Sequence, residues 1–415
     1  MMETTIFYAI IGIIIFEYLL SEFLGYLNAK NYSPELPHEL KGIYDEEKYK
    51  KSQKYEKEKY KFSLIEGFFD ISILLIVLFS GFFGFLDDFL RNIFSNTFLI
   101  SLSFFAIISL LQSFIHLPFS YYFTFVIEEK YDFNKSTKKL FFLDFFKSLL
   151  LGFFIGGILL SLIIRIYTIL GTSFWLYAWG IITIFSLFMM MFYSNIIVPL
   201  FNKQTPLEEG ELKTAIQDFS SKVGFQLDNI YVIDGSKRSS KANAYFSGLG
   251  PKKRIVLYDT LIKDMTTDEI VAVLAHEIGH YKRKHTFQTL VFSIIQTGFM
   301  LYILSLTLGI KEVSFALGVS EASFHIGIIA FSFLFTPLSL ILGVFANILS
   351  RKNEREADEF AGKNYNPESL QNALKKLSIN NLSNLRPHKA YEFFYYSHPT
   401  VLKRLQFLEK IKQEN

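Results

Sequence analysis

Seven long apolar runs constrain the fold of this sequence more than any other feature. They lie at roughly 4–26, 62–86, 93–116, 141–167, 172–196, 286–310 and 322–349. Each exceeds the roughly 18 apolar residues that indicate a helix able to cross about 30 Å of hydrocarbon. The first run has no basic segment before it and no small-residue cleavage site, so it is expected to be a retained span. The sequence therefore predicts an integral membrane protein with seven transmembrane helices.

Lysine is distributed unevenly between the loops that join these runs. The loop after the first run contains nine lysines, from Lys30 to Lys61, and the loop after the third contains four, from Lys130 to Lys139. The opposite side offers few basic residues, namely Arg91, Arg165 and Lys311. Cytoplasmic loops are enriched in Lys and Arg. We therefore expect the N-terminus outside and the polar segments in the cytoplasm.

The polar segments divide the chain into four parts. These are an N-terminal membrane region with five spans (1–196), a cytoplasmic segment (197–285), the last two spans (286–349) and a C-terminal segment (350–415). Alternating apolar residues predict three strands of a small sheet, at 228–236, 243–250 and 254–261. The predicted fold class is an all-α membrane protein with a small α+β part.

Composition excludes several kinds of function. The chain has no cysteine, so disulfides, thiolate metal sites and a cysteine nucleophile are excluded, and a metal must be held by His and carboxylate. The formal net charge of +3 is too small to indicate a nucleic acid partner. The expected partners are the lipid bilayer and a peptide or protein substrate.

The sequence HEIGH at 276–280 is the candidate catalytic and metal-binding motif. Thr266 and Glu269 form a capping-box pattern, followed by apolar residues at helical spacing, so the motif is expected near the end of a helix. His276 and His280, at i and i+4, share one helix face and can bind one zinc ion. Zinc lowers the pKa of a bound water, whose proton Glu277 would take as general base during peptide hydrolysis.

A catalytic zinc site needs a third protein ligand and an open fourth position. Glu354 and Asp358, just past the seventh run, share a helix face and are suitable as ligand and as histidine partner. Glu356 and Glu359 compete with Glu354 by spacing alone. The same stretch could also be a charged helix leaving the membrane, whose acids and bases pair with each other.

Three other histidines have weaker signals. His285 is expected to point to a different helix face from His280 and to have a polar structural role, with partner or outer ligand as the alternative. His116 and His325 lie within apolar runs, where ionisable groups face protein or a water-filled cavity.

Several blocks occur in an order that resembles the type I CAAX prenyl protease family, integral-membrane zinc endopeptidases that process prenylated proteins. The blocks include FVIEEKYDFNKST (125–137), VIDGSKRSSKANAYFSG (232–248), LAHEIGHYKRKH (274–285), RKNEREADEFA (351–361) and YSHPTVLKRL (396–405). The resemblance implies seven helices that form a barrel around a large water-filled chamber. It also implies a gluzincin-like zinc protease domain at the cytoplasmic end, with one Zn²⁺ per chain.

The resemblance also implies roles for individual residues. Glu354 would be the third zinc ligand and Asp358 the acid behind a ligand histidine. His398 and Arg404 would bind the substrate main chain and stabilise the oxyanion. The remaining pair, Asn243 and Ala244, would lie on an edge strand that pairs with the substrate backbone.

The resemblance implies C-terminal CAAX-type processing, and two other functions compete with it. One is a membrane quality-control metalloprotease that acts on unprenylated or misfolded membrane proteins. The other is a transporter or lipid-binding protein with structural zinc. Short extramembrane loops and a tail, LEKIKQEN, without a dilysine signal favour a prokaryotic member in the plasma membrane.

Overall fold

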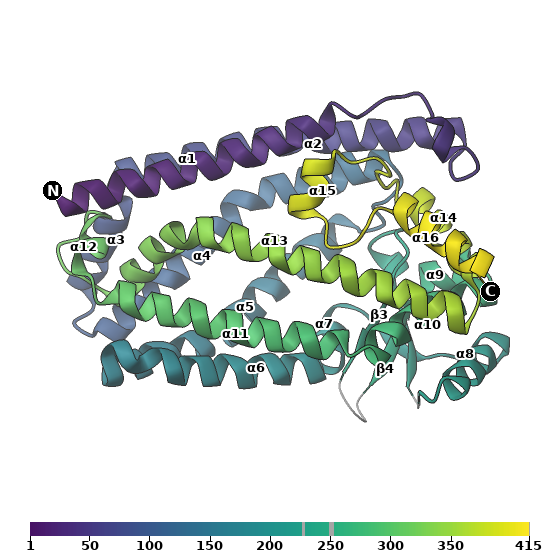
Figure 1. The fold of residues 1–415 in the computed structure, drawn as a ribbon. Helices are drawn as coiled ribbons and strands as arrows, with labels where there is room; N and C mark the ends of the chain where they lie inside the picture. The colour runs from purple at the N-terminus through teal and green to yellow at the C-terminus, as the bar shows by residue number, and fades with distance from the viewer. Residues whose placement is uncertain (226–228, 249–252, 415) are drawn as a thin grey trace.

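The computed structural model of the protein describes residues 1–225, 229–248 and 253–414. Long helices run side by side along most of an elongated body, and a small sheet with shorter helices lies at one end (Figure 1). The amino terminus lies at the opposite end from this sheet (Figure 1). The fold is thus a helical membrane region with one polar domain at its end.

Seven long apolar helices correspond to the seven predicted runs. They are α1 (Met2–Ala29), α2 (Glu46–Phe79), α4 (Thr97–Tyr122), α5 (Lys138–Leu170), α6 (Phe174–Ile196), α11 (His285–Leu308) and α13 (Phe324–Asn364). Among the described residues, six stretches are long and apolar enough to span a membrane, and one of them, Lys138–Phe201, contains both α5 and α6. Leu150 and Phe154 on α5 are each 70% exposed, as lipid-facing side chains must be. The prediction of a multi-pass membrane protein is confirmed.

Two of the predicted runs have different bounds in the structure. The second run was expected to continue to residue 86, but α2 ends at Phe79 because Gly81 adopts a left-handed turn with φ of 69°. A separate short helix, α3 (Phe82–Ile93), follows. The third run extends beyond its expected end, because α4 passes through Pro118 and continues as a π-helical turn (Phe123–Glu128).

Helix α13 is longer than its apolar run. It continues for 41 residues through Pro337 and through the charged segment that contains Glu354 and Asp358. A helix of that length extends about 60 Å, so it crosses the hydrocarbon and projects well beyond it. Glu354 and Asp358 therefore lie on the same continuous helix as the seventh span.

The polar domain contains a four-stranded sheet with the order β1-β2-β4-β3. The strands are β1 (Gln204–Pro206), β2 (Ile230–Ile233), β3 (Ala244–Ser247) and β4 (Arg254–Tyr258). β2 and β4 are parallel, and the other two neighbouring pairs are antiparallel. The three predicted strands are present but shorter than expected, because β2 ends at Ile233 and β4 ends at Tyr258, where helix α9 (Asp259–Asp264) begins. Positions 228, 249 and 250 of those predictions lie outside the described residues. β1 was not predicted, and β3 lies at an edge of the sheet.

Short helices complete the chain. They are α7 (Val198–Phe201), α8 (Glu211–Lys222), α9 (Asp259–Asp264), α10 (Thr267–Lys282), α12 (Lys311–Phe315), α14 (Pro367–Asn380), α15 (Lys389–Tyr395) and α16 (Val401–Glu414). One apolar core joins the sheet to α10, α14 and α16, and includes Leu257, Ile270, Leu274 and Leu408, all buried. The central position of α10 in this core fixes the helix that carries HEIGH.

A cavity of ≈ 1290 Å³ lies between α1, α2 and α4. Its walls carry polar side chains at membrane depth, among them Glu22, Glu66 and Asp70, and it extends to His398 in the polar domain. Ionisable groups within a membrane need water or a partner. The cavity therefore fits the chamber that the family resemblance implies.

Candidate metal centre

Helix α10 presents the two motif histidines near its C-terminal end. Its first turn is closed by a capping box in which Thr266 and Glu269 satisfy each other's backbone N–H groups, as the sequence predicts. The apolar face of the helix, with Ile270, Leu274 and Ile278, is fully buried. His276 and His280 therefore project from a rigid helix toward α13.

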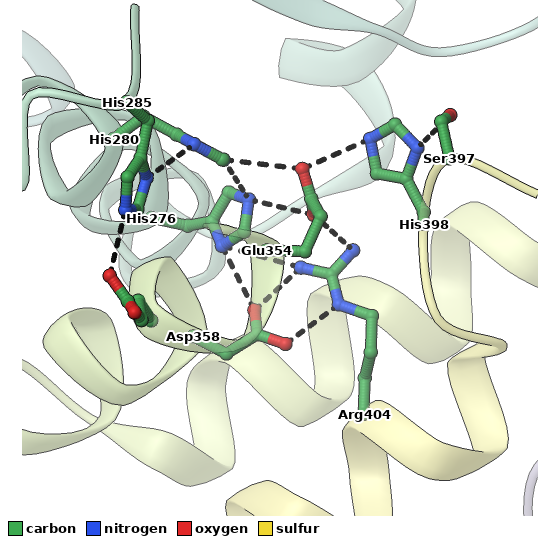
Figure 2. Close-up of polar contacts among 9 residues, drawn as sticks. His276, His280, His285, Glu354, Asp358, Ser397, His398 and Arg404 are labelled. Atoms are coloured by element: carbon green, nitrogen blue, oxygen red, sulfur yellow. Dashed lines mark hydrogen bonds and ion pairs between the residues drawn. The ribbon is translucent and has the colours of Figure 1, made fainter. Parts of the chain in front are cut away.

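The structure brings His276, His280 and Glu354 together, with one ligand atom of each within 4.8 Å of the others (Figure 2). The two Nε2 atoms are 3.1 Å apart, and they lie 3.4 and 3.3 Å from the carboxylate oxygens of Glu354. In a tetrahedral zinc site with metal–ligand distances of about 2.0–2.1 Å, neighbouring ligand atoms are about 3.3 Å apart. The three side chains thus match the spacing that zinc requires.

Glu354 provides a second indication of a cation at this position. Its carboxylate is buried, yet within the described part of the chain its Oε2 atom accepts no hydrogen bond, although His276 Nε2 lies 3.4 Å away. Arg404 Nη1 lies 3.6 Å from this oxygen, beyond hydrogen-bond distance, so a closer cation would satisfy the buried carboxylate better. The residues present therefore fit a bound divalent metal.

Asp358 and Arg404 lie behind His276. Asp358 Oδ1 is 2.9 Å from His276 Nδ1, and Arg404 binds both oxygens of Asp358 at 2.8 and 2.6 Å (Figure 2). A carboxylate on Nδ1 fixes the tautomer that leaves Nε2 free for a metal. Arg404 is also close to Glu354, with 3.6 Å between Nη1 and Oε2. The side chain of Arg404 is largely buried.

These neighbours change the protonation of His276 in the metal-free protein. Burial and the positive charge of Arg404 lower its pKa, but the close carboxylates of Asp358 and Glu354 outweigh both, and the pKa of His276 is raised to about 9. The pocket therefore has a strong preference for a positive charge at the His276 Nε2 position, either a proton or a metal ion.

The expectation that His285 faces away from His280 is wrong. Helix α10 ends at Lys282, Lys284 adopts a left-handed conformation with φ of 60°, and His285 begins α11. The turn brings His285 Nδ1 to 3.1 Å from His280 Nδ1, while its Nε2 lies 3.0 Å from Glu356. Glu356 therefore pairs with His285 and does not belong to the His276, His280 and Glu354 cluster. His285 orients His280 much as Asp358 orients His276.

His398 reaches the cluster from the loop before α16. Its Nε2 is 3.1 Å from Glu354 Oε1, and its Nδ1 is 2.9 Å from the hydroxyl of Ser397 (Figure 2). Its side chain is 60% exposed, so it borders the solvent-accessible side of the three ligand atoms. It also lines the ≈ 1290 Å³ cavity between α1, α2 and α4.

Glu277 faces a second cavity of ≈ 1050 Å³, together with His280 and Asn243. Edge strand β3 forms part of the same wall. The Tyr258 amide donates a hydrogen bond to the backbone carbonyl of Asn243, so Asn243 and Tyr258 are a hydrogen-bonded pair of the antiparallel ladder. In such a ladder the next residue, Ala244, directs its backbone N–H and C=O groups to the open edge of the sheet. The Asn243 side chain accepts from the Ala244 amide at 2.8 Å.

The two intramembrane histidines lie outside the cluster. His325 is buried, with Nε2 2.7 Å from Asp87 and Nδ1 2.9 Å from Ser101. His116 lies 3.6 and 3.8 Å from Asp70 and Glu66, which line the chamber. His325 therefore faces protein, and His116 faces two acidic residues that line the ≈ 1290 Å³ cavity.

Comparison with known proteins covers nearly the whole chain. Residues 25–203 match the family model described as CAAX prenyl protease N-terminal, five membrane helices, and residues 206–412 match Peptidase family M48. CAAX prenyl protease 1 of Saccharomyces cerevisiae is 36% identical, over 94% of this chain and 93% of that protein. The CAAX prenyl protease 1 homolog of Homo sapiens is 34% identical, over 95% of this chain and 94% of that protein.

A solved structure has the same fold. The crystal structure of S. mikatae Ste24p matches with a TM-score of 0.93 at 35% identity, over 97% of this chain and 99% of that chain. Two family models in tandem, near-complete relatives and a matching structure agree with each other and with the His, His, Glu cluster. The chain therefore belongs to the type I CAAX prenyl proteases of peptidase family M48 and is a multi-pass membrane metalloprotease.

Proposed function

We propose that this chain is an endopeptidase in which His276, His280 and Glu354 hold one Zn²⁺ ion and Glu277 is the general base. The observation that supports it most is the close approach of the three side chains beside a cavity lined by Glu277. The two imidazole Nε2 atoms are 3.1 Å apart, and each lies 3.3–3.4 Å from one of the two oxygens of Glu354. A structural zinc site normally has four protein ligands, whereas this cluster offers three. The open position favours catalysis over a transporter with structural zinc.

Each side chain has a separate role in the proposed hydrolysis. When bound, zinc supplies a Lewis acid that activates a water and polarises the peptide carbonyl. Glu277 accepts a proton on its carboxylate and returns it to the leaving amine. His398 borders the reacting side and donates to the developing oxyanion. Arg404, which contacts Asp358 and Glu354, holds the ligands in place, and its substrate contact remains a prediction.

The substrate main chain would add to the open edge of β3. Ala244 directs its backbone carbonyl outward, and the Asn243 side chain lies beside it in the cavity that contains Glu277. Pairing with an edge strand binds an extended peptide through its backbone and not its sequence. A peptide bound in this way would have its scissile bond near the metal cluster and near Glu277.

We propose C-terminal CAAX-type processing as the reaction, because the relatives that cover most of the chain are named CAAX prenyl proteases. The test compares cleavage of a farnesylated CAAX peptide, the same peptide without the lipid, and an unfolded membrane protein. Faster cleavage of either CAAX peptide than of the unfolded protein supports the proposal. Preference for the unfolded protein would support the quality-control alternative.

We further propose that the polar domain faces the cytoplasm and that the N-terminus lies outside. The Lys-rich loops contact the polar domain or each other at the same end of the molecule, as shown by Lys51 with Asp132 and by Lys241 with Glu128. The chain would then have a membrane region at 1–196, protease segments at 197–285 and 350–415, and two spans at 286–349. A prokaryotic plasma membrane remains the predicted location, testable by fractionation and by protease protection of a tag after Asn415.

A further inference from the structure

The segment 234–243 leads from β2 to edge strand β3 and lies against the membrane region. The Ser240 amide donates to the carbonyl of Phe133, in the loop between the π-helical turn and α5, at 3.0 Å. Arg238 binds both oxygens of Asp144, near the start of α5, at 2.7 and 2.9 Å. The chain therefore approaches β3 along the membrane region before it enters the sheet.

Lys241 links this segment to two membrane helices. Its Nζ atom lies 2.8 Å from Glu128 Oε2 and donates to the Tyr55 hydroxyl at 3.1 Å. The same ammonium group lies 4.3 Å from the centre of the Phe133 ring. Glu128 ends the π-helical turn that continues α4, and Tyr55 belongs to α2. One lysine side chain therefore connects the start of the edge strand to α2 and to the end of α4.

The Lys241–Glu128 pair is only partly open to water. Its two side chains are 35% and 12% exposed, and it lies over a buried cluster that includes Tyr55, Ile127 and Phe133. Exposed ion pairs hold a geometry weakly, whereas removal of one partner from a shielded pair leaves a poorly solvated charge. The pair is therefore suited to hold the segment in one position.

The residues from Lys241 to Asn243 have three different surroundings. Lys241 lines the ≈ 1290 Å³ cavity, and Ala242 is buried in the core that joins the sheet to α10. Asn243 lines the ≈ 1050 Å³ cavity that contains Glu277. Because only Ala242 separates the ion-paired residue from the one beside the catalytic cavity, the position of Lys241 determines where the chain enters β3.

We propose that Lys241 is a positioning residue for the substrate, whose ion pair with Glu128 holds the open edge of β3 in place for the peptide. This inference rests on the proposed pairing of the substrate backbone with β3. A strand that is already ordered costs less entropy on binding, so the peptide binds more tightly. Tyr245, whose hydroxyl is 3.3 Å from Ser194 of α6, holds the strand further along. Loss of Lys241 would therefore loosen the beginning of β3 without detaching it.

Lys241→Met tests the role because it keeps the apolar stem and removes the ammonium group. On the CAAX peptide we expect about a tenfold rise in KM with unchanged kcat and zinc content, since a loosened strand weakens binding without altering the metal cluster. Lys241→Arg should keep the KM of the unaltered chain. Lys237→Met, at an exposed lysine of the same segment, is the matched control and should change neither constant. An unchanged KM in Lys241→Met, or a fall in kcat alone, would overturn the proposal.

The partner residue supplies a second variant. Glu128→Gln should also raise KM, and the double variant should be no worse than Lys241→Met, because both changes remove one interaction. Effects that multiply would mean that the two residues act separately, against the proposal. Hydrogen exchange at residues 243–247 needs no cleavage and should be faster in Lys241→Met than in Lys237→Met. A chain that cleaves no peptide would contradict the proposed function, whereas equal exchange in these two variants would contradict the role of Lys241.

Discussion

Gly279 packs directly against the backbone of Ala357. A Cβ added at Gly279 would lie 3.1 Å from both the Cα and the carbonyl oxygen of Ala357, closer than an ordinary contact. This is the point where α10 and α13 cross, between the turns that carry His276, His280 and Glu354. The separation of the three ligand atoms therefore depends on the absence of a side chain at position 279.

Gly279→Ala should weaken metal binding without removing a ligand. The added methyl group must push α13 away by a few tenths of an ångström, and overpacking of this kind destabilises by about 1–3 kcal/mol. We expect a lower melting temperature and a raised dissociation constant for zinc. Gly343→Ala on α13, with nothing within 4 Å of the added Cβ, is the control and should change neither. Unaltered zinc affinity in Gly279→Ala would show that the crossing tolerates the shift.

Glu277→Gln should separate catalysis from metal binding. The amide keeps the shape of the side chain but accepts no proton, and loss of a general base reduces rates by about 10²–10⁴-fold. Zinc content, measured by atomic emission on the purified protein, should stay at the level of the unaltered chain. His276→Ala is the comparison, since it should lose zinc as well as activity. Substantial cleavage by Glu277→Gln would assign the base to another group.

The helices were largely predictable because their signals are local. Each apolar run has to satisfy its backbone within the membrane, so hydropathy alone indicates a helix. The capping box at Thr266 and Glu269 likewise places the start of α10. Strand β1 was missed because its three residues, which include Pro206, give no alternating pattern.

The site was less predictable because its contacts join distant segments. Spacing left Glu354, Glu356 and Glu359 as competing ligands, and only the family resemblance favoured Glu354. The continuity of α13 through Pro337 decides which of them faces α10, and a proline usually suggests a break instead. The prediction for His285 was wrong because α10 ends at Lys282 and Lys284 makes a left-handed turn before α11. A lysine in the sequence does not indicate that conformation.

Asp358→Asn should reduce zinc affinity although Asp358 is not a ligand. The substitution removes the negative charge that orients His276 and leaves Arg404 buried beside a neutral amide. Loss of such an outer partner typically lowers metal affinity by about 10–100-fold. Competition with a fluorescent chelator would measure it. Glu359→Gln is the control, because Glu359 pairs with Lys363 at the surface, and it should bind zinc normally. Equal affinity in both variants would argue against the orienting role.

Zinc binding should release a proton and should weaken as the pH falls. In the metal-free protein the pKa of His276 is raised from 6.5 to about 9, so at neutral pH the folded site holds a proton on this imidazole. Zinc must displace it, and for one proton the dissociation constant rises about tenfold for each unit of pH below that pKa. Calorimetry in buffers of different ionisation enthalpy, at pH values between 6.5 and 9, would count the proton. Binding with no proton released in that window would mean that His276 is neutral before the metal arrives, and that Asp358 and Glu354 do not prepare the site for a cation.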